Sequence, residues 1–158
     1  VTGVQTCALP IFVQSKETSC YLYTMTQTDD LLRKLYDQLR NSGSSFSLVY
    51  FSDHGLAFKE RGKDVQYLAH DDKYQQNFQV PFMVISSDDK AHRVIKARRS
   101  ANDFLGFFSQ WTGIKAKEIN IKYPFISEKK AGSIYITNFQ LQKVDYNHLG
   151  TDIFDPKP

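Results

Sequence analysis

An adjacent aspartate and histidine are the residues of this sequence best suited to chemistry. Asp53 and His54 directly follow the apolar run 46–52. They offer one carboxylate oxygen and one imidazole nitrogen, a mixed donor set that suits zinc or manganese. Zinc usually takes three or four protein ligands, so further donors must come from elsewhere. On residue types alone, a capping aspartate beside a hydrogen-bonded histidine is the commoner explanation.

Short apolar runs predict the sheet that carries this pair. Residues 46–52 read FSLVYFS and are apolar on both faces, which is typical of a strand buried inside a parallel sheet. Residues 81–86 read PFMVIS and predict a second strand, with the proline at its start, where strands tolerate it. Alternating segments at 119–123, 133–137 and 139–146 predict a C-terminal antiparallel hairpin or edge strands.

Two amphipathic helices flank these strands. Leucines recur at helical spacing from residue 28 to residue 41, and the pattern is compatible with an extension back toward Cys20. A second helix follows Ser100, an N-cap residue, and ends at Gly113. Its apolar stripe, which we expect in the core, consists of Phe104, Phe107, Phe108 and Trp111.

The order helix, strand, strand, helix predicts an α/β layered domain with a mostly parallel central sheet. Ligands of such sheets bind at the carboxyl ends of strands, which is where Asp53 and His54 stand. Residues 59–79 lack clear periodicity and are expected to form a long surface loop, and loops of this length usually serve function.

Composition sets broad limits. The 158 residues carry a net charge of +3 and are 41% hydrophobic, as expected for one globular domain or part of one. With 23% charged residues and no apolar run near the roughly 18 residues that a span needs, the sequence contains no transmembrane helix. Net charge alone does not indicate a nucleic-acid partner, and we expect none.

The N-terminal segment Val1–Ile11 does not look native. It matches, codon by codon, the translation of a common sequencing adapter, and it lacks the basic start and longer apolar stretch of a signal peptide. We therefore expect the natural protein to begin here near Phe12, with its preceding part missing. Cys7 belongs to the foreign segment, so Cys20 alone defines no disulfide framework.

Several motifs in a fixed order resemble the bacterial phosphoethanolamine transferases, which are sulfatase-like enzymes of the alkaline phosphatase superfamily. The motifs are LVYFSDHG at 48–55, YLAH at 67–70, and the glutamines 75–76 that lead into VPFMVIS at 80–86. The resemblance extends from Tyr21 to Ile114. It implies an incomplete α/β catalytic domain of the alkaline phosphatase and sulfatase type, with residues 12–158 as its C-terminal portion.

The resemblance also implies roles for individual residues. The Asp and His of the family's S-D-H-G motif bind the catalytic zinc, which makes Asp53 and His54 metal ligands here. A later histidine contacts phosphate or a further metal ion, which makes His70 a catalytic and substrate-binding residue. The nucleophilic threonine and an acidic zinc ligand lie upstream in the family, so this piece is expected to be inactive. Leu56 stands where many members have glutamate, which weakens assignment to the lipid A branch.

The function implied is metal-dependent transfer of phosphoethanolamine from phosphatidylethanolamine to a cell-envelope acceptor such as lipid A or another glycan. The implied partners are a phospholipid donor and a lipid or glycan acceptor. The resemblance places the protein at the bacterial inner membrane, held by N-terminal helices that are missing here, as a monomer with a periplasmic catalytic domain. A sulfatase or phosphoglycerol transferase of the same superfamily is the alternative enzyme.

A basic cluster supports a different class of function. Residues 90–99 contain five Lys and Arg residues and His92. They could bind an anionic surface as part of a non-catalytic α/β module, although a solvated charged face is the commoner explanation. His148 has no partner at metal spacing and is expected in a loop near the chain end.

Overall fold

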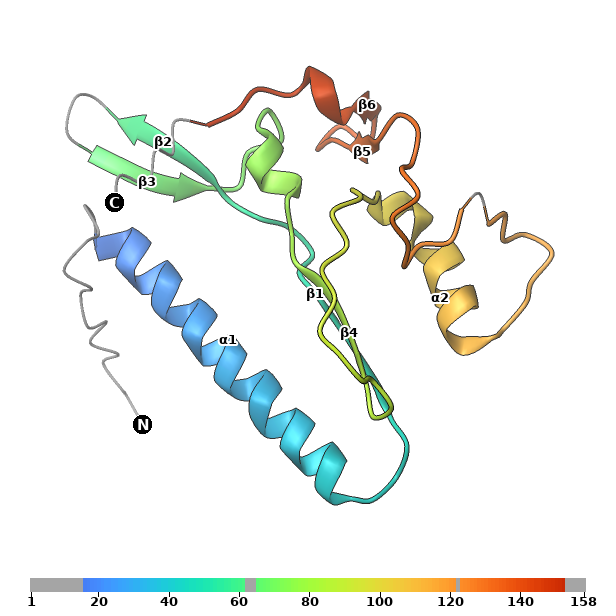
Figure 1. Ribbon diagram of the computed structural model, residues 1–158. Helices are drawn as coiled ribbons and strands as arrows, with labels where there is room; N and C mark the ends of the chain where they lie inside the picture. The colour runs from blue at the N-terminus through green and yellow to red at the C-terminus, as the bar shows by residue number, and fades with distance from the viewer. Residues whose placement is uncertain (1–15, 62–64, 122, 153–158) are drawn as a thin grey trace.

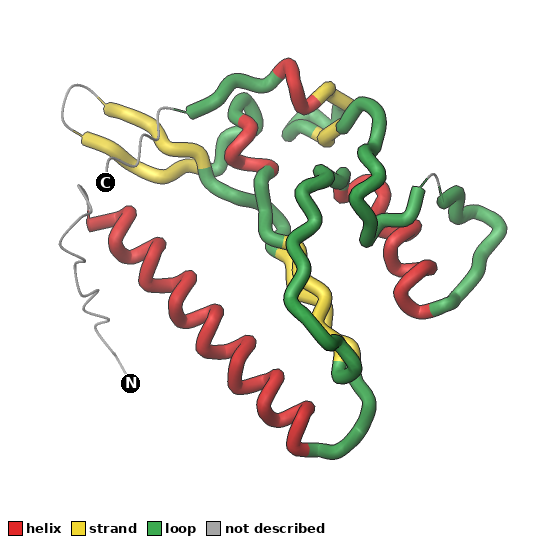
Figure 2. Tube along the Cα trace, viewed as in Figure 1, coloured by secondary structure: helices red, strands yellow, loops and turns green. Residues whose placement is uncertain are grey.

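The computed structural model describes residues 16–61, 65–121 and 123–152, so the segment Val1–Ile11 lies outside the described residues. The helices are α1 (Lys16–Asn41) and α2 (Phe104–Thr112), with 3-10 turns η1 (Gln75–Phe78), η2 (Ala101–Asp103) and η3 (Tyr146–His148). The strands are β1 (Ser47–Phe51), β2 (Ala57–Arg61), β3 (Val65–Ala69), β4 (Phe82–Ser86), β5 (Tyr135–Thr137) and β6 (Lys143–Asp145). Figure 1 shows these elements along the chain, and Figure 2 separates helices, strands and loops.

The first helix forms as predicted and is longer than its leucine pattern, since α1 includes Cys20 and the residues before it. It stops at Asn41 because Gly43 takes a left-handed φ of 71° and donates its N–H back to Arg40. Cys20, which lies within this helix, takes part in a disulfide. None of the helices within the described residues combines enough length with enough apolar character to cross a membrane.

The sheets differ from the prediction. Each of the three sheets formed by the described residues has two strands, and all three pairs, β1 with β4, β2 with β3 and β5 with β6, are antiparallel. The expected mostly parallel central sheet is therefore not seen in this part of the chain. A parallel pair needs a crossover, usually a helix, whereas β1 and β4 are joined by a hairpin and a single 3-10 turn. Apolar residues on both faces of β1 predicted a strand buried in a parallel sheet, but Phe51 is 46% exposed, so the strand is not fully buried in this part of the chain.

Residues 59–79 are not the long surface loop that the sequence predicts. Most of the segment forms β2, β3 and η1 instead, and the hairpin aligns Ala57 with Ala69. The sequence does not reveal β2, because its residues 59–61 are all charged and the strand lacks the alternation of apolar and polar residues that predicts a half-buried strand. The hairpin is short, but its register decides which residues meet at its base.

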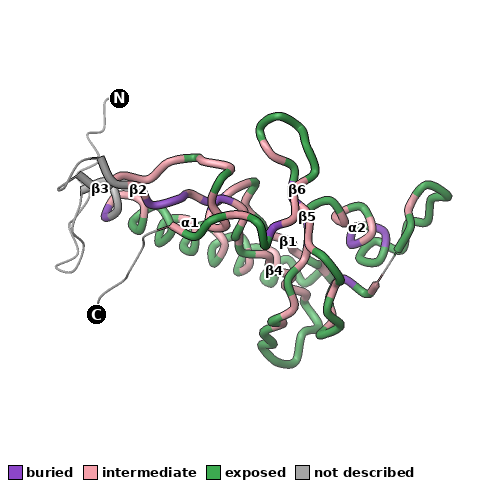
Figure 3. The backbone as a smooth tube through the Cα atoms, turned by 90° about the horizontal axis from the view of Figure 1, so that it is seen from above, coloured by how far each residue is buried: buried purple, intermediate pink, exposed green. Residues whose placement is uncertain are grey.

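An aromatic core connects the second helix to the β1–β4 pair. Phe107 on α2 is 1% exposed, and its ring lies 4.8 Å from Phe82 and 5.2 Å from Phe125 between centroids. Figure 3 shows buried residues on this helix, while most of α1 is exposed. The predicted stripe is thus partly confirmed, since Phe108 and Trp111 remain more than a third exposed.

The predicted capping residues of the second helix and the predicted C-terminal hairpin are both present. The Ser100 side chain accepts a hydrogen bond from Asn102 N at 3.3 Å and so caps η2, which leads directly into α2. Gly113 ends that helix with a φ of 76°, as predicted. The hairpin β5–β6 confirms the expected C-terminal pair, whereas the described residues of 119–123 form no strand.

Candidate metal centre

Asp53 and His54 lie at the carboxyl end of β1, as the sequence predicts. The strand ends at Phe51, and a tight turn follows in which the Ser52 hydroxyl donates to the His54 carbonyl at 2.8 Å. The His54 N–H donates to Asp53 Oδ1 at 2.9 Å. This hydrogen bond, together with the nearby His54 ring, holds the pKa of the Asp53 carboxyl below its ordinary value. Asp53 is therefore a carboxylate at neutral pH.

The His54 ring is oriented for coordination through Nε2. Its Nδ1 lies 2.8 Å from the Gly55 carbonyl oxygen. Because a carbonyl can only accept, Nδ1 carries a proton, which in a neutral imidazole leaves the lone pair on Nε2, an arrangement common among metal-binding histidines. Nε2 lies 3.9 Å from Asp53 Oδ2. Two ligands on one tetrahedral zinc are roughly 3.4 Å apart, so the two atoms fit a shared ion after a small adjustment.

His70 meets His54 although 15 residues separate them in the sequence. The β2–β3 register pairs Ala57 with Ala69, so the residue after β3 returns to the turn from which β2 starts. The two imidazole rings stack with centroids 3.8 Å apart and planes at 13°. The structure thus brings together all three of the residues singled out for chemistry. We call His54 and His70 the histidine pair.

His70 also contacts the turn between β5 and β6. The Phe139 ring meets His70 edge-on, with centroids 4.7 Å apart and planes at 71°. The Phe139 N–H donates to Asp72 Oδ2 at 2.7 Å, which ties this turn to the segment that follows β3. Sequence reasoning assigned Phe139 only to an edge strand, and no local pattern marks its contact with a histidine 69 residues away.

An ion pair fixes the residue that follows His70. Lys59 on β2 forms a salt bridge with Asp71, whose other oxygen accepts from the Lys73 N–H at 3.0 Å. Burial is the largest single influence on the pKa of Asp71 and raises it, but the hydrogen bonds from Lys59 and from the Lys73 N–H, together with the charges of these two lysines, lower that pKa overall. The Asp71 carboxylate therefore stays charged and holds the turn at the base of the hairpin.

A glycine is required where the first turn touches η1. The Gly55 N–H donates to the Asn77 carbonyl at 2.8 Å. A Cβ at Gly55 would come within 2.3 Å of the Gln76 carbonyl oxygen, closer than such atoms approach in proteins. The close approach of Gly55 to η1 depends on a contact between separate segments, for which the sequence carries no local signal. We use "the floor" for η1 (Gln75–Phe78), the unlabelled green turn between β3 and β4 in Figure 1.

The described residues do not complete a metal site by themselves. Among them, no group of three or more His, Cys, Asp and Glu side chains could bind an ion. A zinc ion at Asp53 and His54 would therefore need additional ligands from beyond the described part of the chain.

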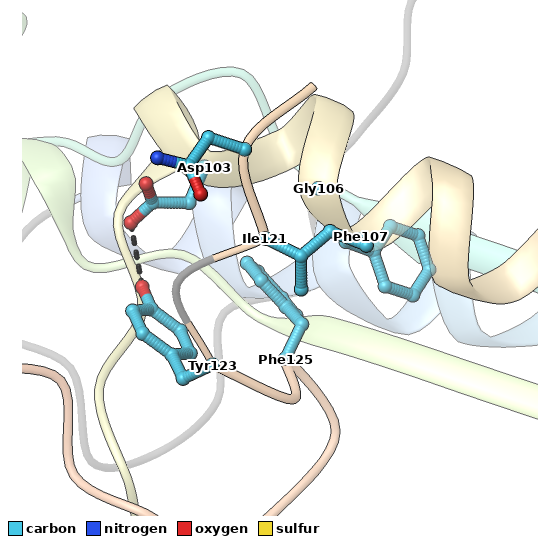
Figure 4. A pocket seen from close by; sticks show the side chains of 7 residues that line it. Asp103, Gly106, Phe107, Ile121, Tyr123 and Phe125 are labelled. Carbon is cyan, nitrogen blue, oxygen red and sulfur yellow. Dashed lines mark hydrogen bonds between the residues drawn. The ribbon is translucent and has the colours of Figure 1, made fainter. Parts of the chain in front are cut away.

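Two cavities lined by described residues lie elsewhere. One has a volume of about 10 Å³, enough for about one water. There the Tyr123 hydroxyl donates to Asp103 at 2.5 Å, the hydrogen bond drawn as a dashed line in Figure 4. Burial and Asp103 raise the pKa of Tyr123 to about 12. A second pocket, of about 340 Å³, is lined by residues 45–47 and 86–88 at the start of β1 and the end of β4, the opposite end of this strand pair from Asp53. Neither pocket includes the histidine pair.

Comparison with known proteins identifies the family. The sulfatase family model matches residues 5–114. The chain is 99% identical over 147 residues to the phosphoethanolamine transferase OpgE of Escherichia coli, a match that covers 93% of this chain and 28% of that protein. It is 36% identical over 53 residues to a Haemophilus influenzae protein named "Putative phosphoethanolamine transferase", covering 31% of this chain and 11% of that protein. No solved structure matches the chain.

These matches confirm the resemblance found in the sequence motifs. The chain spans about a quarter of the length of the Escherichia coli relative. The family match begins inside Val1–Ile11, so the foreign origin of that segment stays a prediction. The matched residues include Asp53, His54 and His70, and they cover more than half of the chain. The chain therefore belongs to the sulfatase family and resembles its phosphoethanolamine transferases.

Proposed function

We propose that the full-length protein to which this chain belongs transfers phosphoethanolamine from phosphatidylethanolamine to a lipid or glycan acceptor of the cell envelope. The observation that carries this proposal is the 99% identity with a segment of a phosphoethanolamine transferase. The arrangement of Asp53 and His54 at the end of β1 supports it, because the two donor atoms face each other at 3.9 Å. The activity belongs to the whole protein, with its periplasmic domain held at the inner membrane.

In this proposal Asp53 Oδ2 and His54 Nε2 hold a zinc or manganese ion. When bound, such an ion stabilises charge on phosphoryl oxygens and favours the ionised form of a nucleophilic hydroxyl, here a threonine upstream of these residues. The Gly55 carbonyl keeps the His54 ring turned so that Nε2 faces Asp53. His70 stacks on that ring and supplies a proton to the departing alcohol or a hydrogen bond to a phosphoryl oxygen.

A direct assay tests the proposed activity. The full-length protein, purified with bound zinc, is incubated with phosphatidylethanolamine labelled in its headgroup and with envelope glycolipid and glycan fractions. We expect diacylglycerol release and transfer of the labelled headgroup to one acceptor fraction, both abolished by a chelator and restored by zinc. Zinc-dependent hydrolysis of a sulfate ester, without headgroup transfer, would instead support the sulfatase alternative.

The basic cluster 90–99 contributes to packing in the structure. The Arg99 guanidinium donates to the carbonyls of Phe125 at 2.7 Å and Ser127 at 2.6 Å, and it lies 4.9 Å from the Tyr123 ring centroid. Arg98 lies 4.9 Å from the Tyr146 ring centroid. Both arginines therefore hold together segments that are distant in sequence.

This packing predicts the effect of neutralising Arg99. Arg99→Gln in the full-length protein should lower the free energy of unfolding by about 1.5–3 kcal/mol, because it removes charged hydrogen bonds to two carbonyls. Arg93→Gln, at an exposed position, should change it by less than about 0.5 kcal/mol. Denaturant titration measures both. If Arg99→Gln leaves stability unchanged but weakens binding to anionic vesicles, the cluster serves an anionic surface instead.

A further inference from the structure

Asn77 connects the two turns that carry the histidine pair. It is completely buried in the floor. Its backbone carbonyl accepts from the Gly55 N–H at 2.8 Å, and its side-chain Oδ1 accepts from the Asp71 N–H at 3.0 Å. Gly55 directly follows His54, and Asp71 directly follows His70. One residue therefore binds the backbone immediately after each histidine.

These two hydrogen bonds set the separation of the two imidazoles. The rings stack at 3.8 Å, but a stacking contact between exposed rings is weak on its own, and His70 is exposed. The backbone on either side must therefore hold them in place. Asp71 is also held by Lys59, yet that salt bridge reaches the side chain, whereas Asn77 is the acceptor for the backbone N–H.

The side-chain amide nitrogen of Asn77, Nδ2, makes no stabilising hydrogen bond with the described residues. Nδ2 is the one buried side-chain donor or acceptor without a hydrogen-bond partner that was found within the described residues. A buried donor without a partner costs about as much as a typical hydrogen bond contributes, so the amide brings little net stability to the floor. A leucine of similar shape would remove this cost, but it would also leave the Asp71 N–H without its acceptor, so the net change in stability should be small. The hydrogen bond that Asn77 Oδ1 accepts from the Asp71 N–H therefore explains why an asparagine stands at this position.

We propose that Asn77 is a positioning residue that sets the distance and orientation of His54 and His70, and thereby the metal affinity of the site. The inference deepens the proposed function, since it takes His54 as a metal ligand and His70 as its neighbour at the reacting phosphoryl group. Asn77 acts through the backbone of Gly55 and Asp71 and touches neither the ion nor the substrate.

The experiment compares two leucine variants of the full-length protein. Asn77→Leu removes the acceptor for the Asp71 N–H. Gln75→Leu is the matched control, because Gln75 also lies in the floor but its amide faces the carbonyls of Tyr146 and Leu149 at 3.4 Å. Three quantities are measured for each: the midpoint of thermal unfolding, the zinc affinity with the visible spectrum of the cobalt-loaded protein, and amide hydrogen exchange in the peptide that contains Asp71.

We expect Asn77→Leu to unfold near the wild-type temperature, to lose about 10- to 100-fold in zinc affinity, and to change the cobalt spectrum. Exchange at Asp71 should accelerate several-fold. Gln75→Leu should match the wild type in zinc affinity and cobalt spectrum. The proposal is overturned if Asn77→Leu keeps wild-type zinc affinity and spectrum, or if Gln75→Leu impairs them equally at a similar unfolding temperature.

Amide exchange separates this inference from the proposed function. If the wild-type protein binds neither zinc nor cobalt, the proposed metal chemistry fails. Faster exchange at Asp71 in Asn77→Leu alone still supports the positioning role, and unchanged exchange rejects it.

Discussion

Alanine at Asp53 or at His54 is expected to remove the metal and the activity of the full-length protein. Each substitution deletes one of the two donor atoms that lie 3.9 Å apart at the end of β1. Loss of an outer partner of a ligand costs about 10- to 100-fold in affinity or activity, and loss of the ligand itself should cost more. We therefore expect zinc affinity to fall more than about 100-fold and headgroup transfer to fall by about 10³ or more.

Metal content after dialysis and headgroup transfer measure this result. Asp88→Ala and His92→Ala are matched controls, because they remove the same side-chain types at exposed positions away from the turn. Both should keep wild-type zinc content, turnover and unfolding temperature. Stability should change little in the Asp53 variant, whose side chain is 89% exposed. Full zinc occupancy and normal turnover in Asp53→Ala and His54→Ala would contradict the assignment of these ligands.

The acidic limit of this site follows from the pKa of Asp53. Hydrogen bonding from the His54 N–H lowers that pKa below its ordinary value of 3.8. A lowered carboxyl pKa means that the folded state favours the charged form, so its contribution is present above pH 3.8 and is lost as the pH falls through the lowered value. Protonation of Asp53 therefore cannot cause a loss of zinc near neutral pH.

The residues of the candidate site could be predicted from the sequence because their chemistry is local. Asp53 and His54 are adjacent in the sequence. The apolar run before them predicts where the strand ends, and this prediction does not depend on which strand pairs with it. The stacking of His70 on His54 depends on the β2–β3 register, which polar residues at 59–61 concealed. The motif resemblance therefore indicated His70 as a site residue without predicting the β2–β3 hairpin that brings it to His54. The contact with Phe139 depends on segments far apart in sequence, for which a single sequence carries no signal.

The strand direction was wrong for a related reason. An apolar run such as FSLVYFS indicates burial and is typical of a parallel sheet, but it does not specify the direction of the neighbouring strand. The connection decides this, because a hairpin and a 3-10 turn return β4 antiparallel to β1. The ends of the second helix were easier to predict, since capping residues act locally. Ser100 caps η2, which leads into α2, and Gly113 ends α2 as expected.

Gly55→Ala is the second substitution with a large expected effect. The added Cβ would lie 2.3 Å from the Gln76 carbonyl oxygen and 3.1 Å from that of Gln79. Both atoms belong to the backbone, so no side chain can rotate away. The floor must move as a unit, which breaks the hydrogen bond from the Gly55 N–H to the Asn77 carbonyl. We expect a loss of about 1–3 kcal/mol in the free energy of unfolding.

The displacement should also reach the metal ligands. The Gly55 carbonyl accepts from His54 Nδ1 and so sets the direction of Nε2. A shifted residue 55 turns the ring away from Asp53, and we expect zinc affinity to fall at least about 10-fold, as for the loss of an outer partner. Denaturant titration and zinc binding measure the two effects on the same full-length protein.

Two other glycines separate a steric effect at the site from a general cost of alanine. Gly106 lies within α2 with open space around its Cβ position, so Gly106→Ala should raise stability by up to about 1 kcal/mol. Gly113 has open space but a φ of 76°, so Gly113→Ala should cost about 1 kcal/mol through backbone strain and leave zinc affinity unchanged. If Gly55→Ala loses stability but binds zinc as tightly as Gly113→Ala, contact with the floor supports the fold and does not direct the ligand. If it loses both, the close approach of the two backbones holds His54 in place.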